Sequence, residues 1–118
     1  VVVVRGSMTV SDLWTDLNCK PDTFIFHRKS YHVHSGMLQS ARELDSEIRP
    51  LVLSLLEENK GFTTVVVGHS LGAGVGALLT AIWCSEQRGD LSETTCYAFG
   101  TPCVASYDLC KELHPIVT

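Results

Sequence analysis

Short runs of β-branched and apolar residues mark the expected strands of this 118-residue chain. Residues 1–4, 63–67 and 95–99 are such runs, and residues 116–118 look like the start of a fourth. The runs are apolar throughout instead of alternating with polar positions, which is typical of strands covered on both faces.

A helical spacing of apolar residues separates the first two runs. The apolar positions recur at intervals of four and three, which predicts one buried stripe of a helix: Met37, Ala41, Leu44, Ile48, Leu51 and Leu55. Ser35 is its expected N-cap and Gly61 its expected stop, and Pro50 should kink or divide it.

The other segments complete an alternation of strands and helices. Residues 71–86 form a small-residue helix ending near Gly89, and residues 105–113 are weakly helical. Residues 12–17 predict a helix or turn, and residues 19–31 an irregular segment with a possible short strand at 24–26. The order predicts an α/β fold: a mostly parallel sheet with helices on both faces.

Composition limits the function classes. A single globular domain fits 45% hydrophobic and 19% charged residues. The net charge of −4, without a stripe of Lys and Arg, argues against a nucleic-acid partner. One short basic stretch is interpreted as a solvated loop: His27, Arg28, Lys29, His32 and His34.

Five cysteines occur in an odd set without a C-x-x-C pair: Cys19, Cys84, Cys96, Cys103 and Cys110. Neither a disulfide framework nor a zinc site is expected, and reduced thiols favour an intracellular or membrane-associated setting. No apolar run approaches the ~20 residues of a membrane span, and residues 1–4 lack the features of a signal peptide. A membrane anchor outside these residues stays possible.

The chemistry-bearing motif is Gly68-His69-Ser70-Leu71-Gly72, a G-x-S-x-G placed between a strong strand and a helix. In that context it predicts a nucleophile elbow, in which a sharp turn exposes the Ser70 hydroxyl. Gly68 and Gly72 would remove collisions with the neighbouring strand and helix. The helix N-terminus would favour developing negative charge.

Two other interpretations compete. Ser70 could simply cap the helix in a glycine-rich turn. Residues 72–77 also satisfy the dinucleotide pattern G-x-G-x-x-A, but Gly72 would already lie within the helix, and the next strand ends without an acid. Close packing of a helix on a sheet explains these small residues better.

Four segments, in order, resemble the class 3 (fungal-type) lipases, most closely their diacylglycerol lipase-like branch. The segments are Val4-Arg5-Gly6-Ser7 with Asp12 and Asp16 following, His34-Ser35-Gly36-Met37-Leu38, Gly68–Gly72 as above, and Tyr97-Ala98-Phe99-Gly100-Thr101-Pro102. The resemblance implies an α/β-hydrolase fold and a serine hydrolase that cleaves fatty-acyl esters of acylglycerols or other lipids. It also implies transient contact with a lipid surface, and no cofactor or metal.

Roles follow at the matching positions. The resemblance makes Ser70 the nucleophile, and makes Leu71 (through its N–H) and Ser7 (through its N–H and hydroxyl) the oxyanion hole. Asp12 and Asp16 would anchor a loop, His34 would be structural, and His69 would pack beside the nucleophile without acting as its base. Cys103 departs from the arginine that many members carry.

A base and an acid for Ser70 are not evident. In this fold they follow the nucleophile in the order acid, then histidine. Asp108 and His114 have that order, but six residues on one helix point them in different directions. We therefore expect residues 1–118 to be a lipase-type domain truncated at both ends, lacking the triad acid and His and inactive alone. A non-catalytic module that binds a lipid or a protein is the alternative.

Overall fold

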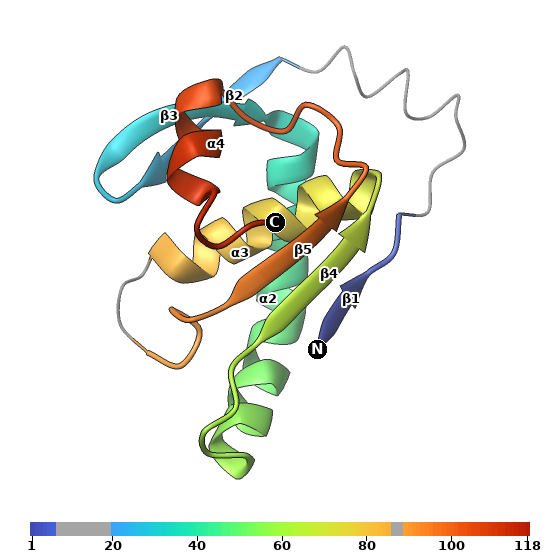
Figure 1. Ribbon diagram of the computed structural model, residues 1–118, viewed down its shortest axis with the longest axis vertical. Helices are drawn as coiled ribbons and strands as arrows, with labels where there is room; N and C mark the ends of the chain where they lie inside the picture. The colour runs from blue at the N-terminus through green and yellow to red at the C-terminus, as the bar shows by residue number, and fades with distance from the viewer. Residues whose placement is uncertain (7–19, 86–88) are drawn as a thin grey trace.

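A three-stranded parallel sheet forms the centre of the computed structural model, which describes residues 1–6, 20–85 and 89–118 (Figure 1). Its strands are β1 (Val2–Val4), β4 (Val65–His69) and β5 (Thr95–Phe99), in the order β1-β4-β5. Both pairings are parallel, as the alternation of elements predicted.

The sheet continues past β5. The Cys96 N–H donates to the Ile116 carbonyl at 2.7 Å, and the Ala98 N–H donates to the Thr118 carbonyl at 2.7 Å. Residues 116–118 therefore pair with β5, which confirms the fourth predicted run.

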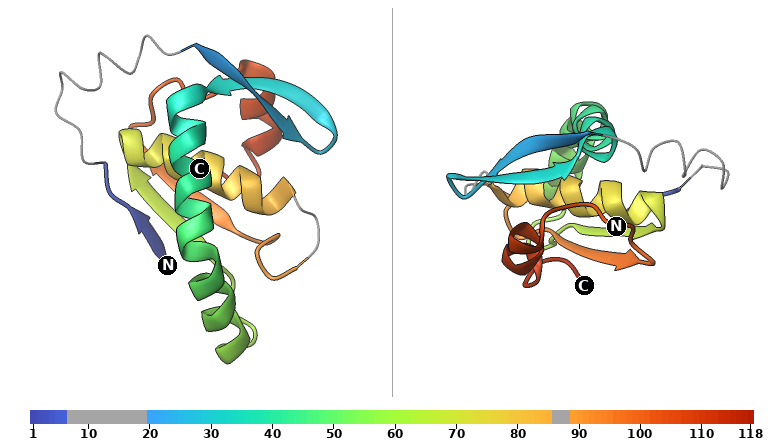
Figure 2. Two further views of the ribbon diagram at one scale, coloured as in Figure 1. Left: turned by 180° about the vertical axis from the view of Figure 1, so that it is seen from behind. Right: turned by 90° about the horizontal axis from the view of Figure 1, so that it is seen from above.

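Helix α3 (Leu71–Ser85) lies between the sheet and helix α2 (Ser35–Glu58), as the views in Figure 2 show. Residues 72–81 of α3 are all buried. A Cβ added at Gly76 would lie 3.1 Å from Val66 Cγ1, so the small residues let the helix approach the sheet closely. The glycines of residues 72–77 thus serve packing, as predicted, and are not open to a nucleotide.

Helix α4 (Tyr107–Leu113) lies beside β5 on the side of the sheet opposite to α2 (Figure 2). Its Leu109 and Leu113 side chains are buried in the core. Away from α4, the same side of the sheet is bare in the described residues: Val3 is 73% exposed and Phe99 is 58% exposed.

Helix α2 differs from its sequence prediction in several details. It runs unbroken through Pro50, so the expected division is wrong. The N-cap is His34 and not Ser35, because the His34 Nδ1 accepts a hydrogen bond from the Met37 N–H at 3.3 Å. The helix ends at Glu58 with Asn59 as its C-cap, before the expected stop at Gly61.

The buried stripe of α2 also shifts along its length. Leu51 and Leu55 are exposed, and Val52 and Leu56 are buried in their place. An α-helix has 3.6 residues per turn, so a stripe of buried residues needs intervals of both three and four. After Ile48 the buried positions follow at intervals of four, whereas the sequence prediction used an interval of three.

Helices α2 and α3 are joined by a polar link within their interface. The indole Nε1 of fully buried Trp83 donates to Asp45 Oδ1 at 2.5 Å. The Arg49 Nε donates to the same oxygen at 2.8 Å. The indole N–H therefore has the acceptor that a buried donor requires.

A β-hairpin occupies residues 21–34, so the predicted short strand at 24–26 is confirmed as part of its first strand, whereas the irregular segment and loop predicted around it are wrong. Strands β2 (Pro21–Phe26) and β3 (Lys29–His34) pair antiparallel over their whole lengths. Their two-residue turn has positive φ at both His27 (47°) and Arg28 (68°), the backbone of a type I′ turn. The turn residues are not Asn-Gly or Asp-Gly, which usually mark such a turn, so the sequence pattern did not predict the hairpin.

The cysteines in the described part of the chain are all free. Cys84 and Cys96 are buried, whereas Cys103 and Cys110 are exposed, and Cys19 lies outside the described residues. Burial raises the pKa of the Cys84 and Cys96 thiols, which keeps them protonated. No helix within the described ranges is long and apolar enough to cross a membrane.

Candidate active site

Ser70 occupies the turn between β4 and α3, at the carboxyl edge of the sheet (Figure 1). Its φ of 54° places a non-glycine residue in the left-handed region. Its N–H donates to the Phe99 carbonyl at the end of β5 at 2.9 Å, and its carbonyl accepts from the Ala73 N–H at 3.0 Å. The neighbouring strand and the first turn of α3 hold this backbone in place, as a nucleophile elbow requires.

Two glycines two residues away from Ser70 leave room for the turn. A Cβ at Gly68 would overlap the Gly72 carbonyl and would lie 2.7 Å from the Ala73 nitrogen. A Cβ at Gly72 would overlap the Val4 carbonyl oxygen and would lie 2.8 Å from the Gly6 nitrogen. Any side chain at either position would therefore force backbone to move.

The end of β1 reaches the elbow from the other side. A Cβ at Gly6 would lie 2.9 Å from the His69 carbonyl oxygen and 3.7 Å from the Leu71 nitrogen. Leu71 is the first residue of α3, so its N–H is among the four that have no acceptor within the helix. Ser7, the other predicted oxyanion residue, lies outside the described residues, as do Asp12 and Asp16.

His69 is the last residue of β4, and its side chain lies near the residue that follows β5. A Cβ at Gly100 would lie 3.6 Å from the His69 Nε2, so the imidazole rests beside Gly100 after β5. The side chain is exposed to solvent.

Asp108 and His114 lie at opposite ends of α4. Asp108 is in the first turn, and His114 is the C-cap. Six residues of helix separate their backbones by about 9 Å along the axis. Both side chains are exposed, and this arrangement does not make an acid–histidine pair.

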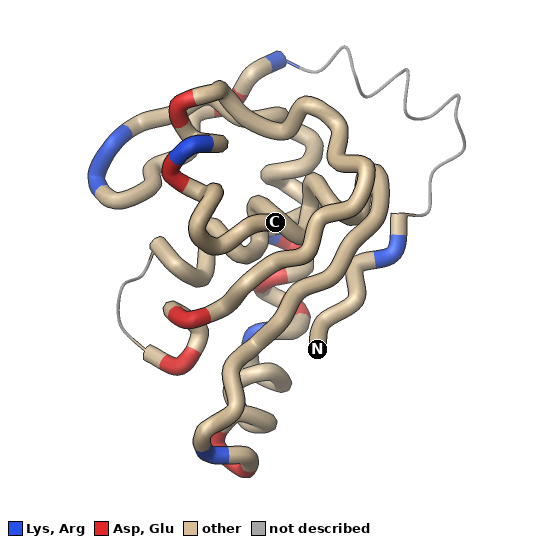
Figure 3. The backbone as a smooth tube through the Cα atoms, viewed as in Figure 1, with Lys and Arg blue, Asp and Glu red and all other residues tan. Residues whose placement is uncertain are grey.

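Charged residues lie beside the elbow but not on the two strand ends that flank it: Arg5, Glu43 and Glu47 line a hollow together with Leu71 and Gly72. Figure 3 shows other charged residues on the hairpin turn, on α4 and along α2, while the carboxyl ends of β4 and β5 carry no Lys, Arg, Asp or Glu.

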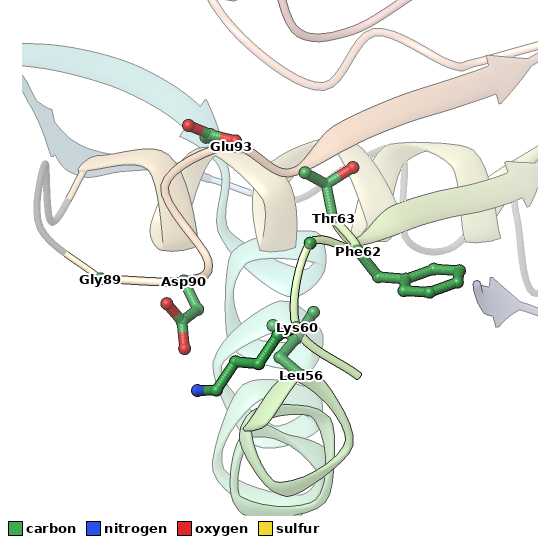
Figure 4. A pocket seen from close by; sticks show the side chains of 8 residues that line it. Leu56, Lys60, Phe62, Thr63, Gly89, Asp90 and Glu93 are labelled. Atoms are coloured by element: carbon green, nitrogen blue, oxygen red, sulfur yellow. The ribbon is translucent and has the colours of Figure 1, made fainter. Parts of the chain in front are cut away.

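A hollow of about 190 Å³ at the amino ends of β4 and β5 has three charged lining residues, Lys60, Asp90 and Glu93 (Figure 4). It lies at the opposite end of the sheet from Ser70. The described residues contain no group of three His, Cys, Asp or Glu that could hold a metal ion.

Sequence reasoning missed two main-chain contributions to the elbow. Phe99 accepts the Ser70 N–H, and Gly6 comes close to Leu71 and Gly72. The glycine after the first strand was a visible signal for the second contact. The hydrogen bond from Ser70 to Phe99 depends on the register of β4 against β5, in which His69 pairs with Phe99. No local sequence pattern indicates that register.

Comparisons with known proteins agree on one family. A family model described as Lipase (class 3) matches residues 1–117. Mouse (Mus musculus) diacylglycerol lipase-beta is 34% identical over 109 residues, which cover 86% of this chain and 15% of that protein. The lipase of Rhizomucor miehei is 29% identical over 113 residues, covering 90% of this chain and 31% of that protein.

Solved structures give the same fold. The crystal structure of a lipase from Rhizopus microsporus var. chinensis has a TM-score of 0.76 at 23% identity, covering 95% of this chain and 39% of that one. A structure of Rhizomucor miehei triacylglyceride lipase has a TM-score of 0.77 at 22% identity, covering 97% and 44%. The chain thus spans less than half of the proteins that it matches. It belongs to the class 3 lipase family and has part of an α/β-hydrolase fold.

Proposed function

We propose that this chain carries the nucleophile and the oxyanion site of a serine hydrolase that cleaves fatty-acyl esters. The observation that supports this most is the left-handed Ser70, held between β4 and α3 with no room for side chains at Gly68 or Gly72. Such a turn projects a hydroxyl from the carboxyl edge of the sheet.

The reaction would proceed through an acyl-enzyme. The Ser70 Oγ loses its proton to a base and attacks the ester carbonyl, and the tetrahedral intermediate then expels the alcohol, which takes up that proton. Water hydrolyses the acyl-Ser70 ester and releases the fatty acid. The Leu71 N–H, and the N–H and hydroxyl of Ser7, would donate to the developing oxyanion.

The base and its orienting acid would come from elsewhere in the full-length gene product. Asp108 and His114 are too far apart along α4 to act together, and His69 rests beside Gly100. The matched lipase structures are more than twice as long as this chain, which leaves ample length for both groups.

An acylglycerol is the proposed substrate, met at a lipid surface. The relatives at 30% identity or more include diacylglycerol lipases, and the Rhizomucor miehei relative is a triacylglyceride lipase. The elbow itself supports only acyl transfer at an ester-like carbonyl.

Ester turnover by the full-length gene product tests the proposal. We expect hydrolysis of p-nitrophenyl butyrate and of a diacylglycerol, reduced at least about a thousandfold by Ser70→Ala. Cys110→Ser, an exposed substitution away from the elbow, is the matched control. Residues 1–118 alone should hydrolyse the ester at the background rate.

A non-catalytic module that binds a lipid or a protein is the second candidate, because Asp108 and His114 do not form a pair in α4. A folded full-length protein that binds lipid vesicles but hydrolyses no ester would favour it.

A further inference from the structure

Two exposed thiols lie on either side of the start of helix α4. Cys103 is in the segment between β5 and α4, and Cys110 is in the middle of α4. Both are free and exposed, whereas the other free thiols of the described residues, Cys84 and Cys96, are buried. The proposed ester hydrolysis uses neither of the exposed pair.

Main-chain hydrogen bonds to β3 hold the segment that carries Cys103. The His34 N–H donates to the Val104 carbonyl at 2.9 Å, and the Ser106 N–H donates to the His32 carbonyl at 2.8 Å. The segment is therefore extended along β3, with which it forms an antiparallel bridge. Figure 1 shows it crossing from the end of β5 to α4.

The side chains of this segment alternate between two sides. Val104 is buried and faces α3, because a Cβ added at Gly74 would lie 3.5 Å from Val104 Cγ2. Cys103 and Ala105 stand before and after Val104, so both point away from α3. Residues on one side of an extended segment recur about every 7 Å, which places Cys103 next to Ala105.

Cys110 contacts the same segment from α4. Its Sγ donates to the Ala105 carbonyl at 3.8 Å. Ala105 directly precedes the N-cap Ser106 and Cys110 is the fourth residue of the helix, two positions that commonly meet at the start of a helix. Burial raises the pKa of the Cys110 thiol, and a negative charge on Cys103 raises it further, so the two sulfurs are near enough to interact.

We propose that Cys103 and Cys110 form a reversible disulfide, a modification site that fastens α4 to the segment after β5. A hydroperoxide oxidises one thiol to a sulfenic acid, and its own O–O bond is reduced to water or an alcohol. The other thiol attacks that sulfur as its thiolate. The S–S bond forms, and the hydroxide that leaves takes up the proton of the attacking thiol as water. A thiol such as glutathione reverses the step by two exchanges and ends as its own disulfide.

Both sulfurs are open to such reagents. Cys103 lines a hollow of about 280 Å³ beside β3, and Cys110 lines one of about 430 Å³ on the exposed face of α4. Burial raises the pKa of the Cys84 and Cys96 thiols, and protonated thiols in the core are inert. Among the described cysteines, oxidation therefore selects the pair at α4.

The first experiment treats the folded full-length gene product with hydrogen peroxide, blocks the remaining thiols with N-ethylmaleimide and maps peptides after digestion with trypsin and chymotrypsin. Cleavage after Tyr107 separates Cys103 from Cys110, so their peptides stay joined only through a disulfide. We expect the joined peptides after peroxide and their separation by dithiothreitol. Cys103 joined to another cysteine, or no joined peptides at all, would overturn the inference.

The second experiment asks whether the fold, and not only the short spacing in the sequence, brings the two thiols together. In a glutathione redox buffer, the ratio of disulfide to free pair should be at least about tenfold higher in the folded protein than in the same protein unfolded in urea. An equal or lower ratio in the folded protein would contradict the proposed site.

Single substitutions provide the controls. Cys103→Ser and Cys110→Ser are exposed changes, and each should abolish the joined peptides and leave the other thiol to be oxidised alone. Cys19→Ser should leave the joined peptides in place. Their loss in Cys19→Ser, or their persistence in Cys103→Ser, would show that the pair is assigned wrongly. None of these outcomes depends on ester hydrolysis, so the disulfide and the proposed function stand or fall separately.

Discussion

The elbow at Ser70 and the hairpin turn at His27 and Arg28 share an uncommon backbone. Among the described residues, these three are the non-glycine residues with positive φ. Each costs about 1–2 kcal/mol relative to ordinary backbone. The two regions bear that cost for different reasons, and the difference separates the turn proposed to carry a nucleophile from a turn that only joins two strands.

At the elbow, packing on several sides imposes the conformation. The Phe99 carbonyl holds the Ser70 N–H, and backbone fills the space beside Gly68 and Gly72. Ser70 cannot relax without moving β4, β1 or α3. Surrounding structure can hold a residue in a strained backbone conformation. Such residues cluster at active sites and ligand-binding sites.

At the hairpin turn, the strain is local. His27 and Arg28 are exposed and close two strands whose last pair is Phe26 with Lys29. The His27 ring stacks on Phe26 at 4.0 Å between centroids, and Lys29 meets Glu112 at 3.7 Å with both side chains exposed. Phe26 is buried, but in these contacts no backbone packs against the turn as it does at the elbow, and the turn requires only a backbone that can take positive φ.

The largest expected effect tests whether packing holds the elbow. Gly68→Ala should destabilise the protein by about 3 kcal/mol or more, because the new Cβ overlaps backbone. Gly61→Ala is the matched control: Gly61 has a φ of 89° and no atom within 4 Å of an added Cβ, so it should cost about 1 kcal/mol. Urea-unfolding midpoints measure both. Equal costs would mean that the space beside Ser70 is not tightly filled.

A smaller effect separates strain from function. Ser70→Gly and Arg28→Gly should each raise the free energy of unfolding by about 1 kcal/mol, since glycine accepts positive φ. Only Ser70→Gly should abolish ester hydrolysis. Ser70→Ala and Arg28→Ala, which keep the strain, should not stabilise. Loss of hydrolysis in Arg28→Gly would contradict the distinction between the two regions.

The smallest effect concerns the link between the hairpin and α4. Lys29→Ala should change the free energy of unfolding by less than about 0.5 kcal/mol, because an exposed ion pair contributes little in water. A double-mutant cycle with Glu112→Ala isolates the pair. A coupling energy well above 1 kcal/mol would show that the hairpin turn is tied down much as the elbow is.

The sequence predicted most of the sheet and the position of its elbow. Residues 95–99 coincide with β5, and α3 begins at Leu71 as the G-x-S-x-G context implied. These elements have strong local signals: β-branched runs, small residues at helical spacing, and glycines at fixed distances from Ser70.

The hairpin and the ends of α2 were not predictable in the same way. His27-Arg28 lacks the glycine or asparagine that announces a type I′ turn, and antiparallel pairing over six residues overrides that local preference. His34 caps α2 through an imidazole, a less common cap than the Ser35 hydroxyl beside it. At the site, the contacts of Phe99 and Gly6 depend on tertiary register, which a single sequence does not state.

The most direct test of the central claim is covalent labelling of the folded full-length gene product with a fluorophosphonate, followed by mass spectrometry of its peptides. The account predicts one modified residue in this chain, Ser70, and no labelling here after Ser70→Ala. A product that hydrolyses esters but carries the label on another serine, with Ser70 unmodified, would contradict it.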